Sequence, residues 1–262
     1  MTRHGQPIWF ELSTSDADAA KSFYGRLLGW QFTTSGNVGF DYRLAQRDGV
    51  MVAGVMSLDN CPAGTPPNWL VYVAVDDTDI AAGSTAASGG QVLTAPTDVP
   101  GTGRFAVLAD PQGAVFGVLH ATPMGTPADD ATDETGAWDQ NRAGHGNWLE
   151  LMSRDPQAGF RFYADLFGWG AGDALDMGEQ GRYQLFRHNG SDIGGMMGLG
   201  DAPAPFWLPY FGVDDVARAH QVITDQGGTV LAGPSEVPGP ALIVVAQDPQ
   251  GATFAIVGPR PD

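Results

Sequence analysis

The chain has 262 residues, of which 43% are hydrophobic and 16% charged, so it can bury a core, and general disorder is disfavoured. Its formal net charge of −17 argues against a nucleic acid or an anionic membrane surface as partner. A single cysteine, Cys61, excludes an intramolecular disulfide and a cysteine-based zinc site. No signal-peptide pattern and no apolar run of membrane length occur, which predicts a soluble, cytoplasmic protein.

A long internal repeat organises the chain. Residues 9–30, WFELSTSDADAAKSFYGRLLGW, return at a constant offset as residues 148–169, WLELMSRDPQAGFRFYADLFGW. Self-similarity on this scale predicts two domains of ordinary size rather than one large one.

Each copy of the repeat predicts a strand, a helix and a turn. Residues 9–14 alternate, with Phe10 and Leu12 on one face, as in a half-buried strand. Asp16 stands where a helix N-cap is expected, and apolar residues follow it at helical spacing. Gly29 suits the left-handed position that ends a helix.

A fainter repeat lies within each half. Residues 70–92 repeat the order of strand, capping aspartate, helix, glycine and strand, with Asp76-Asp77 as the helix cap and Asp214-Asp215 as its counterpart. The Asp-Pro-Gln-Gly segments at 110–113 and 248–251 read as turns. The chain therefore reads as four βαβββ modules paired into two domains.

The sequence also predicts where the domains end. The first domain is expected at 1–122 and the second at 144–262, with a polar linker at 123–143. Trp138 is the only apolar anchor in that linker, and both a docked and a loose linker remain open.

These motifs make the chain resemble the vicinal oxygen chelate superfamily, which includes glyoxalase I, bleomycin-resistance proteins and extradiol dioxygenases. Within it, the chain resembles the tandem two-domain actinobacterial members, often labelled glyoxalase-like or hydroxylase. The resemblance implies an α+β fold in which paired modules form curved mixed sheets, with one concave cup per domain. This fold hosts several chemistries and several pure binders, so it does not name a reaction. The resemblance rests on the first strand, Asp16, Phe23-Tyr24, Leu28-Gly29-Trp30 and the Asp110-Pro111-x-Gly113 turn, all repeated in the second half.

The resemblance also implies where a metal would bind, because metal-dependent members carry His or Glu ligands on three strands of the cup. None of the side chains at the matching positions can ligate a metal, and all five histidines fall elsewhere. We therefore predict no metal and no other cofactor in either cup, which disfavours dioxygenase and true glyoxalase activity. The matching positions are Trp9, Leu70 and Gly117 in the first half, and Trp148, Leu208 and Ala255 in the second.

The side chains expected to face the cup are rich in aromatic rings. Such a wall, with a few polar groups, suits a flat organic ligand. The alternative is that these rings fill the cup and close it. The predicted ligand-binding residues are Trp9, Tyr42, Tyr72, Arg104, Trp148, Met152, Tyr183 and Tyr210.

Two carboxylates, Glu11 and Glu150, are expected on the cup-facing side of the first strand of each half, next to the tryptophan on that side. Each could act as a general base opposite Tyr72 or Tyr210, or could simply pair with a neighbouring arginine or tyrosine hydroxyl. Two other polar residues are not repeated in the other half, which hints that the two cups differ. The counterpart of Arg104 is Leu242, and the counterpart of His145 is Gln6.

These observations favour a metal-independent protein that binds an aromatic small molecule. By analogy with the family, the ligand would be an aromatic polyketide of anthracycline type, bound during antibiotic biosynthesis or for self-resistance, with a tailoring enzyme as a possible partner. The second hypothesis is a cofactor-free isomerase, hydratase, cyclase or hydroxylase-assisting enzyme with Glu11 or Glu150 as base. The third is a duplicated domain kept for assembly. Whether the chain is an enzyme, and whether it is a monomer or a homodimer, remains open.

Overall fold

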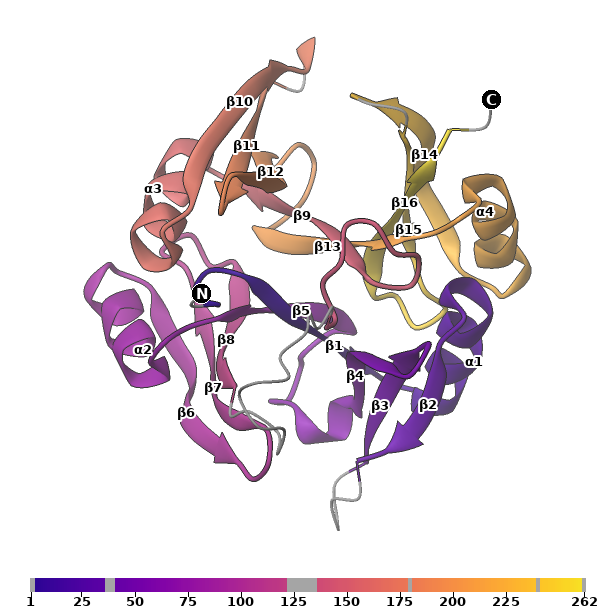
Figure 1. Ribbon diagram of the computed structural model, residues 1–262, viewed down its shortest axis with the longest axis horizontal. Coiled ribbons are helices and arrows are strands. Elements are labelled where there is room, and N and C mark those ends of the chain that lie inside the picture. Colours follow the sequence, from indigo (N-terminus) through magenta and orange to yellow (C-terminus); the bar gives the residue numbers. More distant parts are fainter. Residues whose placement is uncertain (1–2, 36–40, 122–135, 179–180, 239–240, 261–262) are drawn as a thin grey trace, which may run out of the picture. The chain divides into compact units, whose positions relative to one another are not determined.

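The computed structural model describes residues 3–35, 41–121, 136–178, 181–238 and 241–260 (Figure 1). The first module contains β1 (Pro7–Thr14), α1 (Ala17–Leu28), β2 (Gln31–Thr34), β3 (Tyr42–Arg47) and β4 (Val50–Ser57), followed by the 3₁₀ turn η1 (Leu58–Asn60). The second contains β5 (Asn68–Ala74), α2 (Thr78–Ala87), β6 (Gln91–Val99), β7 (Gly103–Ala109) and β8 (Val115–Ala121).

The second half repeats this order. Its first module contains β9 (Gly146–Ser153), α3 (Pro156–Phe167), β10 (Gly170–Asp176), β11 (Arg182–His188) and β12 (Ser191–Gly198). Its second contains β13 (Phe206–Gly212), α4 (Val216–Asp225), β14 (Thr229–Val237), β15 (Ala241–Gln247) and β16 (Thr253–Pro259). The predicted α+β class and the four βαβββ modules are confirmed.

Each half contributes one eight-stranded mixed sheet. The strand order is β2-β3-β4-β1-β5-β8-β7-β6 in the first half and β10-β11-β12-β9-β13-β16-β15-β14 in the second. Within a module the first and last strands run parallel, as β1 and β4 do, and the other neighbours run antiparallel. This order places β4 between β1 and β3, which matters for the site below.

The predicted helix ends are confirmed. The carboxylate of Asp16 accepts hydrogen bonds from the first backbone amides of α1, and Asp77, Asp155 and Asp215 cap the other three helices in the same way. Both long helices, α1 and α3, end at a glycine with φ of 70°. None of the described helices is long and apolar enough to cross a membrane.

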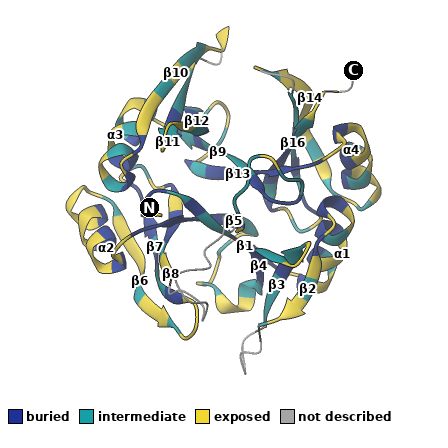
Figure 2. Cartoon of the chain, in the orientation of Figure 1, coloured by how far each residue is buried: buried dark blue, intermediate teal, exposed yellow. Residues whose placement is uncertain are grey.

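Burial follows the predicted alternation in β1, where Phe10 and Leu12 are fully buried while Trp9 and Glu11 are only partly so. Strand β5 differs, because residues on both of its faces are buried, including Tyr72. Figure 2 shows buried residues along the central strands and exposed residues along β6 and β14.

The chain also divides into two compact units that do not coincide with the two halves. One comprises Met1–Ile8, Val71–Glu134 and Leu149–Trp207, and we call it the first unit. The second unit comprises Trp9–Leu70, Thr135–Trp148 and Leu208–Asp262. Each unit thus brings together most of one module from each half of the sequence.

A buried hydrogen-bond chain lies inside the second unit. The Tyr24 hydroxyl accepts from Trp69 Nε1 and donates to Asp248 Oδ2, both over 3.0 Å. Asp248 Oδ1 accepts the backbone amides of Gln250 and Ala252, so this carboxylate also shapes the predicted turn. Burial raises the pKa of Tyr24 well above its usual value and also raises the pKa of Asp248.

The predicted linker, 123–143, lies only partly in the described residues, because 122–135 fall outside them. Trp138 forms an isolated bridge with Gly146, and Ala137 is buried. The Asn147 side chain donates to the carbonyl of Asp139 over 2.6 Å. The end of the predicted linker is therefore docked within the second unit.

Candidate functional site

Three of the predicted site residues form one hydrogen-bond chain in the second unit. Trp9 Nε1 donates to the Tyr42 hydroxyl over 3.0 Å, and that hydroxyl donates to Glu11 Oε2 over 2.8 Å. Trp9 and Glu11 emerge from the same face of β1 because side chains two apart in a strand share a face. Tyr42 reaches them from β3, two strands away in the sheet.

Tyr42 can reach Glu11 because the intervening strand carries a glycine. Gly54 on β4 pairs with Glu11 on β1 and with Leu44 on β3. A Cβ atom at Gly54 would overlap the hydroxyl and ring of Tyr42. The glycine therefore opens the path along which the phenol crosses β4.

The third module repeats this arrangement inside the first unit. Gly195 on β12 pairs with Glu150 on β9 and with Leu185 on β11, and a Cβ there would overlap the Tyr183 ring. A tyrosine thus lies over a glycine beside the predicted carboxylate in both copies. The sequence predicts the tyrosines and carboxylates as site residues but not the part played by Gly54 and Gly195. Their recurrence at matching positions of the repeat was the available signal.

The electrostatics keep Tyr42 protonated. Burial is the largest cause that raises the pKa of Tyr42 well above its usual value, and the charge of Glu11 adds to it. The hydrogen bond from Trp9 acts in the opposite direction. At neutral pH the phenol is therefore a donor, and Glu11 is the acceptor at the end of the chain.

A third tyrosine lies over a glycine, this time in the second module. Tyr72 pairs with Gly117 across β5 and β8, and a Cβ at Gly117 would overlap the Tyr72 ring. Phe105 meets the same ring edge-on with centroids 6.4 Å apart. In the fourth module the buried Tyr210 pairs with Ala255 instead.

The residues at the metal positions implied by the resemblance do not fit a metal. Trp9, Leu70, Trp148, Leu208 and Ala255 offer no ligand atom in their side chains. A carboxylate at position 117 would meet the Tyr72 ring, so that position is closed sterically as well. Across the described ranges, no group of three or more His, Cys, Asp or Glu is placed to hold a metal ion.

Three further predicted site residues lie on β9. Trp148, Glu150 and Met152 alternate with buried leucines on β9 and are partly buried. Met152 has Met197 as its partner across the strand pair.

Arg104 is engaged by carboxylates. Its Nε donates to Asp79 over 2.7 Å and its Nη1 to Asp98 over 3.0 Å. These ion pairs connect β7 to α2 and β6. The two aspartates therefore already neutralise the guanidinium that a ligand would have to bind.

His145, which occurs in only one half of the repeat, is fully buried. Its Nδ1 lies 2.9 Å from the Gly136 carbonyl, and burial is the main cause that lowers its pKa.

Comparison with known proteins agrees with this architecture. The family model described as the glyoxalase/bleomycin resistance protein/dioxygenase superfamily matches residues 6–118 and again 145–256. The chain is 32% identical to the "Putative glyoxylase CFP32" of Mycobacterium tuberculosis (strain CDC 1551 / Oshkosh), covering 99% of this chain and 97% of that protein. It is also 32% identical to the anthracycline biosynthesis protein DnrV of Streptomyces peucetius, covering 98% and 95%.

Solved structures share the fold at low sequence identity. The Mn(II)-bound glyoxalase from Novosphingobium aromaticivorans superposes with a TM-score of 0.67 at 17% identity, covering 98% of this chain and 83% of that one. The 2,3-dioxygenase LapB from Pseudomonas sp. KL28 gives 0.67 at 13% identity, covering 100% and 95%. With two family matches, four modules and relatives above 30% identity over nearly the whole chain, the protein belongs to the glyoxalase/bleomycin resistance protein/dioxygenase superfamily.

Proposed function

We propose that this protein is a metal-independent binder of a planar aromatic small molecule of the aromatic-polyketide class, acting in antibiotic biosynthesis or self-resistance. The observation that carries the proposal is the Trp9–Tyr42–Glu11 chain. It supplies an indole and a phenol held by a shared hydrogen bond, with a carboxylate beside them.

This arrangement is suited to binding because little of it has to be ordered when a ligand arrives. The Tyr42 ring lies in the path left by Gly54, and its hydroxyl is engaged on both sides. Fixed aromatic surfaces reduce the entropy lost on association. A carboxylate next to them can accept a hydrogen bond from a ligand hydroxyl and fix its orientation.

The relatives support the ligand class. DnrV and the similar DauV of Streptomyces sp. (strain C5) are named anthracycline biosynthesis proteins, and they match this chain over nearly its full length. The side chains at the metal positions support the metal-independent part of the proposal, because they cannot ligate and one position is closed by Tyr72.

The test is a titration of the full chain with an anthracycline-type polyketide, with and without EDTA. Binding is measured by tryptophan fluorescence and by calorimetry. We expect saturable binding that ignores the chelator and weakens at least tenfold in Trp9→Ala. Trp148→Ala is the parallel variant that reports on the second copy of the repeat. Binding that requires an added divalent metal would contradict the proposal.

The same residues favour one second candidate, a cofactor-free enzyme with Glu11 as general base. The specific observation is that a carboxylate and a protonated phenol, the two kinds of group that acid–base catalysis of an isomerisation, hydration or ring closure can use, lie next to each other. Glu11→Gln separates the two functions. Turnover should collapse if the carboxylate is the base, whereas affinity should change little if the site only binds. Glu150→Gln asks the same question of the second copy.

A further inference from the structure

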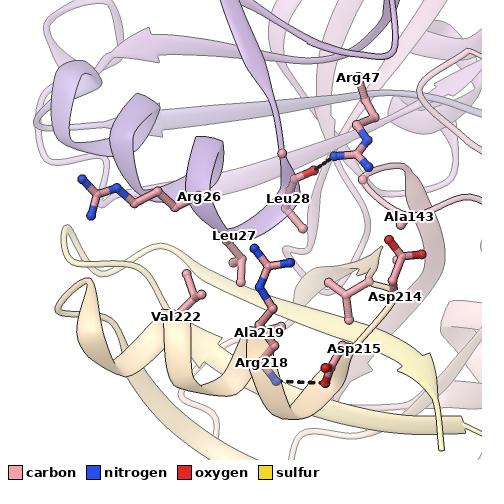
Figure 3. A pocket seen from close by; sticks show the side chains of 14 residues that line it. Arg26, Leu27, Leu28, Arg47, Ala143, Asp214, Asp215, Arg218, Ala219 and Val222 are labelled. Carbon is pink, nitrogen blue, oxygen red and sulfur yellow. Dashed lines mark hydrogen bonds between the residues drawn. The ribbon is translucent and has the colours of Figure 1, made fainter.

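A cavity of about 150 Å³ lies within the second unit, away from the Trp9–Tyr42–Glu11 chain (Figure 3). Its walls come from the C-terminal end of α1, the end of β3, the segment at 143–144, the turn that leads into α4, and one face of α4. The volume is enough for a small organic molecule or several waters.

The cavity gathers positive charge in a strongly acidic chain. Arg26, Arg47 and Arg218 line it, although the whole chain has only 13 basic residues against 30 acidic ones. Asp214 and Asp215 also line it, but the Asp215 carboxylate caps α4 by accepting the backbone amide of Arg218. The lining thus carries three arginines against two aspartates, in a chain whose net charge is −17, and an unpaired guanidinium there can attract an anion.

The three arginines are engaged to different degrees. Arg26 donates to Gln226 over 2.9 Å and points away from the centre in Figure 3. Arg47 is held against the wall, since its Nη1 donates to the Leu28 carbonyl over 3.1 Å and its Nε lies 3.3 Å from a carboxylate oxygen of Asp48. The guanidinium of Arg218 reaches toward the end of α1, and within the described part of the chain it has no hydrogen-bond or ion-pair partner.

Two glycines make room for Arg47. A Cβ at Gly29 would overlap its guanidinium, and one at Gly144 would press on its side-chain carbons. The position of this cation is therefore fixed by the backbone around it, which is a feature of a preorganised site.

The repeat supplies an internal comparison, because the first unit contains the same backbone arrangement. Trp30 Nε1 donates to the Gly144 carbonyl over 2.7 Å, and in the first unit Trp169 Nε1 donates to Gly5 over 2.7 Å. The amide of Gly144 donates to Gly212, as the amide of Gly5 donates to Ala74. The two locations are therefore equivalent. Aligned on these bonds, Arg26, Arg47, Ala143 and Arg218 correspond to Asp165, His188, His4 and Ile80.

In the first unit the equivalent space holds an imidazole. His4 Nε2 lies 3.1 Å from the Leu166 carbonyl at the end of α3, and His4 Nδ1 accepts the backbone amide of Asp76 over 3.2 Å. Ala143 has no such side chain, so the corresponding space stays open in the second unit. A role in capping the helix does not account for the arginines, because α3 ends with the same glycine geometry and without them.

We propose that this cavity is a binding site for a small oxyanion, either a carboxylate or a phosphate. Arg218 supplies a guanidinium that has no partner among the described residues, and Arg47 supplies one held by the Leu28 carbonyl and Asp48. A guanidinium presents paired N–H donors that match the oxygens of either group. The site is independent of the proposed aromatic ligand and is confined to the second unit.

The test measures binding of sodium acetate and of inorganic phosphate to the full chain by calorimetry, at constant ionic strength adjusted with sodium chloride. We expect saturable binding of at least one anion, weakened at least tenfold in Arg218→Gln. Arg161→Gln is the matched control, because it removes the same charge from an exposed position on α3 and should bind like the wild type.

A second variant addresses the space rather than the charge. Ala143→His places in the second unit the imidazole that the first unit has, and it should abolish binding with all three arginines intact. The comparison of acetate with phosphate identifies the class of anion. The proposal is overturned if neither anion binds saturably, if Arg161→Gln weakens binding as much as Arg218→Gln, or if both site variants bind normally.

Discussion

The hydroxyl of Tyr24 donates to the carboxylate of Asp248 over 3.0 Å, although 224 residues separate them in the chain. The other half contains the equivalent bond, in which the Tyr163 hydroxyl donates to the Asp110 carboxylate over 3.1 Å. In each case the helix of one half is connected to the Asp-Pro-Gln-Gly turn of the other half, inside one compact unit. The duplication has thus preserved a reciprocal buried connection between the halves.

The first prediction is that Tyr24→Phe lowers the free energy of unfolding by about 1–3 kcal/mol, the usual effect of leaving buried polar groups without a partner. The change removes the acceptor of Trp69 Nε1 and a donor to Asp248. Urea denaturation measures it, and Tyr163→Phe, with the equivalent bonds to Trp207 and Asp110, should behave alike.

This loss should depend on pH. Burial raises the pKa of Asp248 in the folded state, so the protonated form is favoured there, and the resulting stability is present below the unfolded pKa of about 3.9 and lost as pH rises through the folded value. The Tyr24 hydrogen bond lowers that pKa, so its removal should cost more at about pH 7 than at about pH 4. An equal loss at both values would mean that Asp248 is not the partner that matters.

The features that the sequence predicts are set by residues adjacent in the chain, whereas the features that it does not predict are set by residues far apart in the chain. The alternation around Phe10 and the caps at Asp16 and Gly29 depend on a few adjacent residues, so the sequence predicts them. The part played by Gly54 depends on which strand lies on each side of β4, and that order is set by long-range pairing. The cavity beside Arg218 depends on Ala143 standing where the repeat has His4, a difference that acquires meaning only once the two backbones are seen to be equivalent.

The second prediction concerns Gly54→Ala. The added Cβ would overlap the Tyr42 ring, so the ring must move and its hydrogen bond to Glu11 should break. We expect at least tenfold weaker binding of the aromatic ligand, with a loss of stability of about 1–3 kcal/mol from the overpacked ring. Calorimetry and urea denaturation measure the two effects.

A matched control is Gly83→Ala on α2. A Cβ there meets no atom within 4 Å, and alanine is the better helix former, so this variant should be as stable as the wild type or more so and should bind ligand normally. Unchanged ligand affinity in Gly54→Ala would show that the position of Tyr42 does not determine binding.

The third prediction is that Arg104→Gln leaves ligand affinity unchanged. Its guanidinium is engaged by Asp79 and Asp98, both exposed, so the change should also alter the denaturation midpoint only slightly. A marked loss of affinity would instead return Arg104 to the binding residues expected from the sequence, and calorimetry at two salt concentrations would separate a direct contact from long-range attraction.

The fourth prediction is that His145 makes the protein less stable in mild acid. Burial is the main cause that lowers the pKa of His145, and the positive charges of Arg142 and Arg47 also lower it. The carbonyl of Gly136 and the charge of Asp139 act in the opposite direction. The lowered value means that the unfolded state takes up the proton first as pH falls below about 6.5, so stability is present above that pH and is lost below it.

His145→Gln tests this directly, since glutamine is the residue that the repeat carries at the equivalent position, Gln6. Urea denaturation between about pH 7.5 and about pH 5 should show a shallower loss of stability in the variant than in the wild type. Part of the slope should remain, because burial also lowers the pKa of His188. Parallel curves for the two proteins would show that His145 titrates equally in the folded and unfolded states, and its buried position would then have no bearing on acid stability.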